Sequence, residues 1–197
     1  YATMLHQTLL KELVDVHLVT PKIMLGRLNP NNKWLGYLDK LILFPRQLRK
    51  KVLKIESSRK ARCVVHVCDH SNSPLFNAVA KQKTILTCHD LIAIRSARGE
   101  FSGQVPRFSG RTLQAIIKRS IPRANHIACD SKATESDLHE LFPTTTGRTS
   151  VVHPGFNAAY NRLPNEILVD RLSDLKIPPK SDVLLHVGSN AWYKNRM

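Results

Sequence analysis

The stretch VVHVCDHSNSPLF, residues 64–76, brings two histidines, a cysteine and an aspartate close together in the chain. These residue types are common zinc ligands, so a metal site is the first chemistry to consider. On a β-strand, however, His66, Cys68 and His70 would extend over roughly 13 Å of one face, and Cys63 would point to the other face. Because ligands this far apart cannot meet on one ion, the spacing predicts no metal site.

The segment TCHDL, residues 87–91, ends a second apolar run with a histidine and an acid. Here His89 could donate a hydrogen bond to a hydroxyl or oxyanion of a ligand, while Asp90 holds a loop or sets the tautomer of the ring. A purely structural histidine is the competing interpretation. The chain has no GxSxG motif to support a hydrolase triad, and it has neither a GxGxxG motif nor a Walker P-loop.

Apolar periodicity predicts that helices and strands alternate along the chain. Helices are expected over residues 1–14, in two pieces across 34–55 that are interrupted at Pro45, and over 74–83, 112–119 and 131–142. Strands are expected at 14–20, 63–68, 84–91, 125–130, within 149–156, and at 182–188. A long polar loop is expected over 92–109, and a proline-containing polar stretch precedes the last strand.

This alternation predicts an α/β fold, Rossmann-like, with a mostly parallel sheet and helices on both faces. In such sheets a ligand binds beyond the carboxyl ends of the strands. The candidate site residues are therefore the polar groups that follow each apolar run. These are Asp69, His70 and Ser71, His89 and Asp90, Asp130 and Ser131, Pro154 and Gly155, and Gly188 and Ser189. For the first three, lining a pocket and capping a loop are equally open roles.

Charge is the unusual bulk property, because the net charge is +15 and the sequence pI is about 10.1. It indicates an anionic partner such as nucleic acid, an acidic membrane surface or a phosphorylated substrate. No apolar run approaches the roughly 18 to 20 residues of a membrane-spanning helix. The four cysteines lack the dense spacing of a disulfide-stapled domain, which favours a reducing, cytoplasmic setting.

Five segments in the order HVCDHSN, TILTCHDL, ANHIACDSKATESDL, SVVHPGFN and LLHVGSNAWYKNR resemble glycosyltransferase family 4. Members of this family are retaining enzymes with the two-domain GT-B architecture. The opening YATMLHQTLLKEL resembles the helix that follows the family's glycine-rich first loop. The resemblance covers residues 1–197. It implies transfer of a sugar from a nucleotide-diphosphate donor to an acceptor hydroxyl on a glycan or lipid-linked molecule, with neither metal nor other cofactor.

The resemblance also implies roles for residues of the first domain. His89 matches the family's active-site histidine, which lies at the cleft between the domains near the donor sugar. The implied acceptor side of the cleft is formed by Asp69, His70, Ser71, Asp90 and Ser131. For Ser131, which would open a helix facing the cleft, capping of that helix is the competing role.

On the donor side, Gly188 and Lys194 match positions where a glycine allows close approach to the nucleotide and a lysine contacts the diphosphate. A fixed cation there would stabilise charge on the leaving group. Ser189 departs from the pattern, since many relatives have arginine at this position. Arg196 is a candidate to compensate, although its position favours a helix surface.

The family's pair of glutamates, spaced eight apart, would lie beyond Met197. We therefore expect a fragment at both ends that has no transferase activity alone. The expected domains are an N-terminal, acceptor-side domain over 1–157 that lacks its first strand, a linker over 158–180, and the start of a nucleotide-sugar-binding domain over 181–197.

The segment from Trp34 to Arg62 combines apolar residues at helical spacing with a surplus of lysine and arginine. It is expected to contact an anionic membrane surface, with a solvated helix as the alternative. The resulting expectation is a cytoplasmic protein, either free or peripheral at the inner face of the cell membrane. The alternative function is a basic α/β module that binds nucleic acid or anionic membrane without catalysis. The chain lacks a clear nucleic-acid-binding motif, so no specific nucleic acid is expected.

Overall fold

The computed structural model describes residues 1–29, 33–156, 158, 160–178, 181–189 and 191–194. The side chains of residues 33, 34 and 166 lie outside this description as well. The chain divides into two compact units, residues 1–155 and residues 156–197, and each unit is described by itself.

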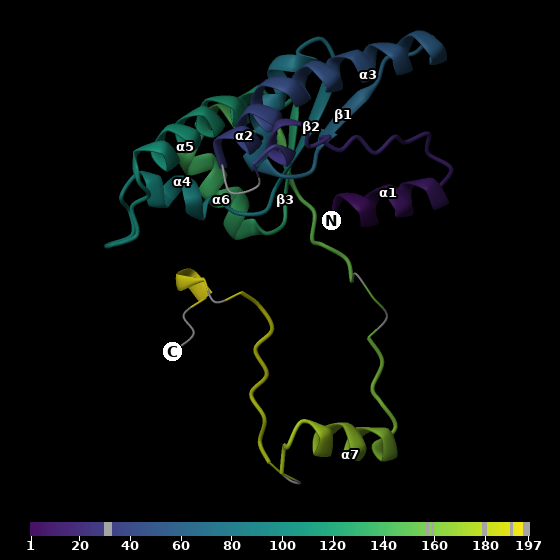
Figure 1. The fold of residues 1–197 in the computed structure, drawn as a ribbon, viewed down its shortest axis with the longest axis vertical. Helices are drawn as coiled ribbons and strands as arrows, with labels where there is room; N and C mark the ends of the chain where they lie inside the picture. Colours follow the sequence, from purple (N-terminus) through teal and green to yellow (C-terminus); the bar gives the residue numbers. More distant parts are fainter. Residues whose placement is uncertain (30–32, 157, 159, 179–180, 190, 195–197) are drawn as a thin grey trace. The chain divides into compact units, whose positions relative to one another are not determined.

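The first unit is built on a parallel sheet of four strands in the order β1-β2-β3-β4 (Figure 1). The strands are β1 (Val64–Val67), β2 (Lys83–Cys88), β3 (His126–Cys129) and β4 (Thr149–Val151). Each strand is parallel to its neighbour. Valine, isoleucine and threonine are frequent in these strands, as expected where helices cover the sheet. The predicted α/β fold with a parallel sheet is confirmed.

Helices surround this sheet (Figure 1). The α-helices of the first unit are α1 (Ala2–Lys11), α2 (Lys33–Leu38), α3 (Phe44–Arg59), α4 (Ile92–Ala97), α5 (Phe108–Ser120) and α6 (Lys132–Leu141). Its 3-10 helices are η1 (Leu25–Arg27), η3 (His70–Val79), η4 (Ile121–Arg123) and η5 (Pro143–Thr145), and η2 (Asp39–Leu43) is a π-helix. The second unit contains α7 (Asn165–Asp174) and the 3-10 helix η6 (Trp192–Lys194).

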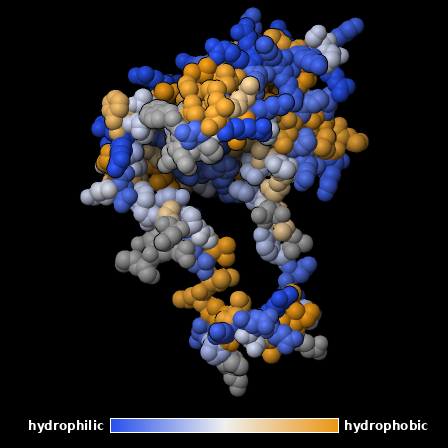
Figure 2. All heavy atoms as spheres, viewed as in Figure 1, coloured by the Kyte–Doolittle hydropathy of each residue, from blue (hydrophilic) through white to orange (hydrophobic). Residues whose placement is uncertain are grey.

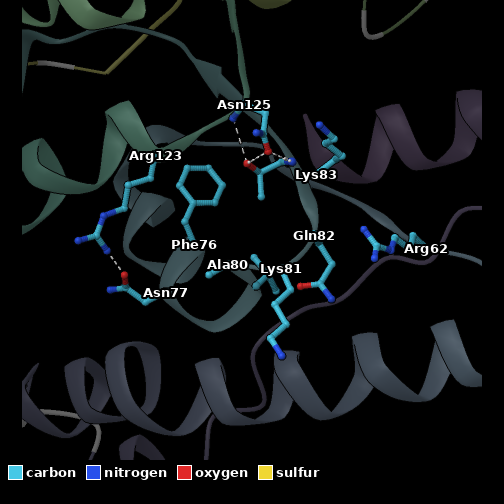
Figure 3. Close-up of a pocket in the computed structure, with 11 residues that line it drawn as sticks. Arg62, Phe76, Asn77, Ala80, Lys81, Gln82, Lys83, Arg123 and Asn125 are labelled. Carbon is cyan, nitrogen blue, oxygen red and sulfur yellow. Dashed lines mark hydrogen bonds between the residues drawn. The ribbon is translucent and has the colours of Figure 1, made fainter.

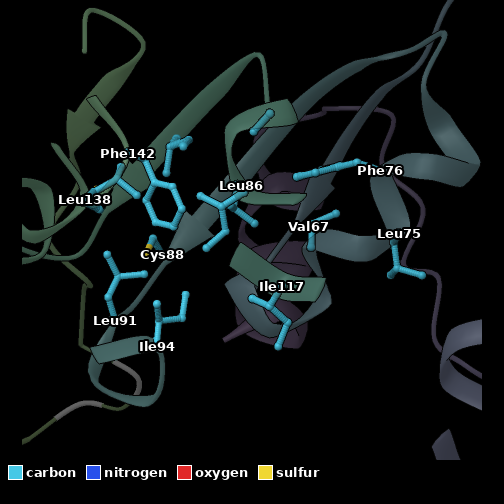
Figure 4. Packing of buried hydrophobic residues seen from close by; sticks show 14 of the residues in the cluster. Val67, Leu75, Phe76, Leu86, Cys88, Leu91, Ile94, Ile117, Leu138 and Phe142 are labelled. Carbon is cyan, nitrogen blue, oxygen red and sulfur yellow. The ribbon is translucent and has the colours of Figure 1, made fainter. Parts of the chain in front are cut away.

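The hydrophobic core lies around β2 and β3, the two inner strands (Figure 4). Leu86 of β2 and Ile127 of β3 are fully buried, and Leu138 of α6 is also fully buried. On α3 the buried residues Phe44, Leu48 and Val52 recur every four positions, which places them on one face of the helix. Each fully buried Leu or Ile side chain stabilises the fold by about 1.5–3 kcal/mol relative to exposure.

Two predicted strands are wrong. Residues 14–20 and 182–188 form no strand, and neither segment has a ladder partner among the described residues. An alternating sequence becomes a strand only where a neighbouring strand accepts and donates its backbone hydrogen bonds. Without such a neighbour, Leu184 and Leu185 are almost fully exposed.

The predicted long loop over 92–109 is also wrong in part, because α4 occupies its first six residues. The stretch after Pro164, expected to be irregular, contains α7, which starts directly after that proline. The break expected at Pro45 is replaced by the π-helix η2, and Pro45 lies at the start of α3. A proline inside a helix lacks an N–H and crowds the carbonyl four residues earlier, so the wider turn before Pro45 accommodates it.

Candidate functional site

The carboxyl ends of β1, β2 and β3 meet at His89. Its Nδ1 lies 2.6 Å from Oδ2 of Asp130, and its Nε2 lies 3.0 Å from the carbonyl oxygen of Cys68. The register explains the first contact, because Cys88 pairs with Cys129 and the next residues along the two strands are His89 and Asp130. One imidazole therefore joins the ends of three neighbouring strands.

Both partners of the His89 ring accept hydrogen bonds. A carbonyl oxygen can only accept, and so can an ionised carboxylate, so each ring nitrogen must donate its own proton. This geometry holds His89 as an imidazolium cation. Burial by itself lowers the pKa of His89, but the hydrogen bond and charge of Asp130, the Cys68 carbonyl and the charge of Asp69 outweigh it and raise the pKa above its ordinary value.

Three of the predicted cleft residues accept hydrogen bonds from backbone N–H groups that follow them, and two of the three, Asp69 and Ser131, are N-caps. Oδ1 of Asp69 accepts a hydrogen bond from the backbone N–H of Ser71 at 2.6 Å, at the start of η3. Asp90 accepts from the N–H two residues further on at 3.1 Å, ahead of α4. Ser131 accepts from the N–H three residues further on at 3.1 Å and is the N-cap of α6. The capping roles left open by the sequence are therefore present in the structure.

His70 differs from His89 in both burial and bonding. Only 8% of it is exposed, and its Nδ1 is buried with no hydrogen-bond partner among the described residues. Burial is the main cause that lowers the pKa of His70, and the positive charge of His89 adds to it against Asp69 and Asp90. A neutral imidazole with an unpaired nitrogen thus lies one residue after Asp69. Leaving this buried nitrogen unpaired costs about 1–3 kcal/mol.

Sequence reasoning did not assign the partners of His89. Asp130 was noted only as a polar residue after a strand, and its pairing with His89 depends on the register of β2 and β3. Thr134, which is 7% exposed, donates a hydrogen bond to the backbone carbonyl of His89 at 3.1 Å. His153 lies with Nδ1 3.0 Å from the carbonyl oxygen of Asp130. The signal for all three was their position just beyond β3, at the start of α6 or just beyond β4.

Arg95 of α4 fixes the helices beside this site. Its guanidinium lies 2.6 Å from a carboxylate oxygen of Glu100, 2.8 Å from Asp137 and 2.6 Å from Glu140. The last two residues belong to α6, so the ion pairs join α4 to α6. These are the helices whose first turns follow Asp90 and Ser131.

No group of three His, Cys, Asp or Glu side chains in the described part of the chain could hold a metal ion. In the opening motif, His66 lies with Nε2 2.8 Å from Oγ1 of Thr87, so it bonds to the neighbouring strand. Burial lowers the pKa of His66.

The predicted donor-side residues belong to the second unit. Gly188, Ser189 and Lys194 are exposed there, and Nζ of Lys194 lies 5.5 Å from the centre of the Tyr193 ring. The donor-binding role of these three residues stays a prediction. The expected domain limits at 157 and 180 stay predictions too.

The basic segment forms α2, η2 and α3, although the side chain of Trp34 and residues 30–32 lie outside the description. Tyr37, Leu38 and Ile42 are exposed apolar residues of this segment. In Figure 2 apolar spheres gather over α2 beside hydrophilic spheres of α3. In the described residues, no helix has both the length and the apolar character needed to cross a membrane.

Comparisons with known proteins give one match. The family model described as Glycosyltransferase Family 4 matches residues 1–160. No curated protein and no solved structure matches the chain.

Proposed function

The chain belongs to glycosyltransferase family 4, and from this premise we propose that it serves a retaining transfer of a sugar. The donor is a nucleotide-diphosphate sugar, and the acceptor is a hydroxyl of a glycan or of a lipid-linked molecule. Residues 1–155 provide the acceptor side and His89. Gly188, Ser189 and Lys194 contact the donor, and the reaction requires no metal.

The observation that carries this proposal is that both ring nitrogens of His89 are hydrogen-bonded. Asp130 holds Nδ1 through a charged pair, whereas Nε2 bonds only to the neutral carbonyl of Cys68. Of the two partners, the carbonyl is the easier one for a ligand to replace, because hydrogen bonds between charged groups are the stronger ones. The side chain is 30% exposed, so a sugar hydroxyl can reach it. The imidazolium then donates from Nε2 to the sugar while Asp130 keeps the ring in place.

His70 supports the acceptor assignment. Its unpaired Nδ1 lies on the loop that also contains Asp69 and Ser71, directly beyond β1. Since its ring is neutral, Nδ1 either donates to or accepts from a hydroxyl, depending on the tautomer. In this proposal His70 orients the acceptor and His89 contacts the donor sugar.

The test is a screen of nucleotide-sugar hydrolysis and transfer by the full reading frame in which this sequence occurs. The His89→Ala variant should lose about 10²-fold to 10³-fold in kcat/KM, as when one preorganised donor is removed from an active site. The matched control is His126→Ala, because His126 is exposed at the amino end of β3 and bonds to Ser150. Retention of activity by His89→Ala to within a few-fold would overturn the assigned role. Lys194→Ala should mainly raise KM for the donor.

Membrane contact through the segment from Trp34 to Arg62 is a further part of the proposal, with a cytoplasmic protein that is peripheral at the inner face of the cell membrane. Exposed cations of α3 beside the apolar residues of α2 support it. The alternative, a basic module without catalysis, rests on the same net charge of +15. Binding to duplex DNA and to anionic vesicles over a salt series separates the two, since tight and steeply salt-dependent DNA binding favours the alternative.

A further inference from the structure

Residues at or just before the amino ends of β2 and β3, together with Arg62 and part of η3, line a groove of about 590 Å³ (Figure 3). β2 begins here at Lys83 and ends at Cys88, so the groove lies roughly 16 Å from the His89 end. It is separate from the proposed sugar-transfer site and goes beyond that function. Phe76 and Val79, both of which are buried, and Ala80 contribute an apolar part of its wall.

Four cations line this groove, and they come from separate parts of the chain. Arg62 precedes β1, Lys81 and Lys83 lie at the start of β2, and Arg123 ends η4. None of the four forms an ion pair with any residue that the structure describes. No acid is among the described residues that line the groove. The like charges repel one another, so the arrangement favours an anion that neutralises them.

Glu56 contacts the groove residue Gln82, and its carboxylate is already engaged. One carboxylate oxygen of Glu56 accepts a hydrogen bond from the backbone N–H of Cys63 at 2.9 Å, and the other accepts from the side chain of Gln82 at 3.1 Å. Glu56 therefore links the residue before β1 to the turn before β2. It is not among the residues that line the groove.

Neutral side chains position the polar part of the wall. Arg123 donates a hydrogen bond to Oδ1 of Asn77, which holds its guanidinium at the rim (Figure 3). Oδ1 of Asn125 accepts from the backbone N–H of Thr84 at 2.8 Å and from its hydroxyl at 3.0 Å. Because these bonds fix the Asn125 amide, its NH₂ group is left as a donor on the groove. In Figure 3, Arg123 and Asn77 lie on one side and Arg62 lies on the other.

We propose that this groove binds the phosphate groups of a phosphorylated ligand. Two arginines match phosphate oxygens with their paired N–H groups, and the lysines add charge without a geometric demand. Four cations exceed the charge of one phosphate and suit a diphosphate or two neighbouring phosphates. The volume leaves room for an attached group against Phe76. The phosphate belongs either to a free small molecule or to a lipid headgroup.

The test measures pyrophosphate binding to the whole chain by calorimetry at constant ionic strength. The double variant Lys83→Gln/Arg123→Gln should bind pyrophosphate at least about tenfold more weakly, which is about 1.4 kcal/mol, because it removes two of the four cations that line the groove. Arg111→Gln/Lys11→Gln is the matched control, because it removes one arginine and one lysine from exposed helix positions outside the groove. Circular dichroism melting checks that both variants fold.

Vesicles distinguish the two sources of phosphate. If phosphatidic acid vesicles bind, pyrophosphate displaces them and the groove variant fails to bind them, the ligand is a lipid headgroup. If pyrophosphate binds in the groove and the vesicles do not compete, the ligand is a free phosphorylated molecule. Absence of pyrophosphate binding, or an equal loss in the control variant, would overturn the proposal. The comparison of the groove variant with its matched control involves no transfer reaction, so the result does not depend on the proposed transfer activity.

Discussion

The two ends of β2 treat charge in opposite ways. At the carboxyl end, the cation His89 is paired with Asp130, and Arg95 is paired with three acids. At the amino end, Lys83 and the other three cations of the groove lack an acidic partner within the described ranges. Pairing fixes the position of a side chain, whereas unpaired charge remains available to a ligand. The carboxyl end of β2 therefore holds its charged side chains in fixed positions, whereas the amino end leaves its cations available to an anionic ligand.

The largest expected effect comes from breaking the strand that both ends share. Leu86→Ala removes a fully buried side chain between them and should lower the free energy of unfolding by about 2–5 kcal/mol through lost burial and a cavity. Urea denaturation measures this loss. Ile116→Ala on α5 is the control, since Ile116 is 38% exposed and should cost less. Equal losses in the two variants would mean that β2 is not the centre of the core.

The next effect comes from unpairing the carboxyl end. Asp130→Asn removes the charge that stabilises the His89 cation and should lower the free energy of unfolding by about 1–2 kcal/mol at pH 6. This is the size expected for a hydrogen bond between charged groups that are partly exposed. In the same variant the pKa of His89 should fall, because burial then acts with less opposition. NMR titration of the ring measures it, and an unchanged pKa would contradict the pairing.

The sign of the pH effect follows from the raised pKa of His89. Its contribution to stability is complete below the unfolded value of about 6.5 and is lost as the pH rises through the higher folded pKa. His66 and His70 have lowered pKa values, so they decrease the free energy of unfolding as the pH falls below about 6.5. The difference in unfolding free energy between the unmodified chain and Asp130→Asn should therefore shrink as the pH increases above 6.5. If this difference in unfolding free energy did not change with pH, Asp130 would not act through the charge of His89.

Helix capping at the same end should give a smaller effect. Ser131→Ala removes the acceptor for the first turn of α6 and should cost about 1 kcal/mol of unfolding free energy. Ser136→Ala, at an exposed position inside the same helix, is the control and should be close to neutral. If Ser131→Ala lowers transfer activity without changing stability, a direct role in the cleft replaces the capping role.

The smallest effect is expected at the amino end. Lys81→Gln removes an exposed cation that has no described ion-pair partner and should change the free energy of unfolding by less than about 0.5 kcal/mol. A slight gain at low salt would reflect relief of repulsion among the groove cations. Thermal melting at two salt concentrations measures it. A decrease of about 1 kcal/mol or more in the free energy of unfolding is typical of a lost buried interaction and would contradict the absence of an ion pair at Lys81.

The sequence predicted the inner part of the fold well, because buried strands are continuous apolar runs that end in polar residues. TILTC and HIAC follow this pattern and form β2 and β3. Residues 14–20 alternate between apolar and polar side chains and still form no strand, since strand formation depends on a neighbouring strand that the local pattern does not contain. The prolines around α7 are typical of a loop and hide this helix in the sequence, although proline before the first helical turn is favourable.

The candidate site was predictable by position and not by bonding. His89 and Asp90 were both placed at a strand end, and the sequence suggested Asp90 as the possible partner of the ring. The partner is Asp130, which is distant in the chain and adjacent only through the pairing of β2 with β3. The unpaired cations of the groove likewise depend on which residues the fold brings together. Charge along the sequence gives the surplus and not its location.

The π-helix η2 has a consequence for mutation by insertion or deletion. Its last hydrogen bond spans five residues, from the N–H of Phe44 to the carbonyl of Asp39, so η2 contains about one residue more than an α-helical turn. Meanwhile the Asp39 carboxylate accepts three backbone hydrogen bonds from residues 24–26. Deleting one residue between 40 and 43 would remove this extra residue and restore an ordinary helix, so α3 would keep its orientation relative to Asp39, whereas the same deletion within α3 would rotate the residues beyond it by about 100°. The apolar stripe of α3 would stay on the core, so we expect η2 to tolerate a one-residue deletion that α3 itself does not.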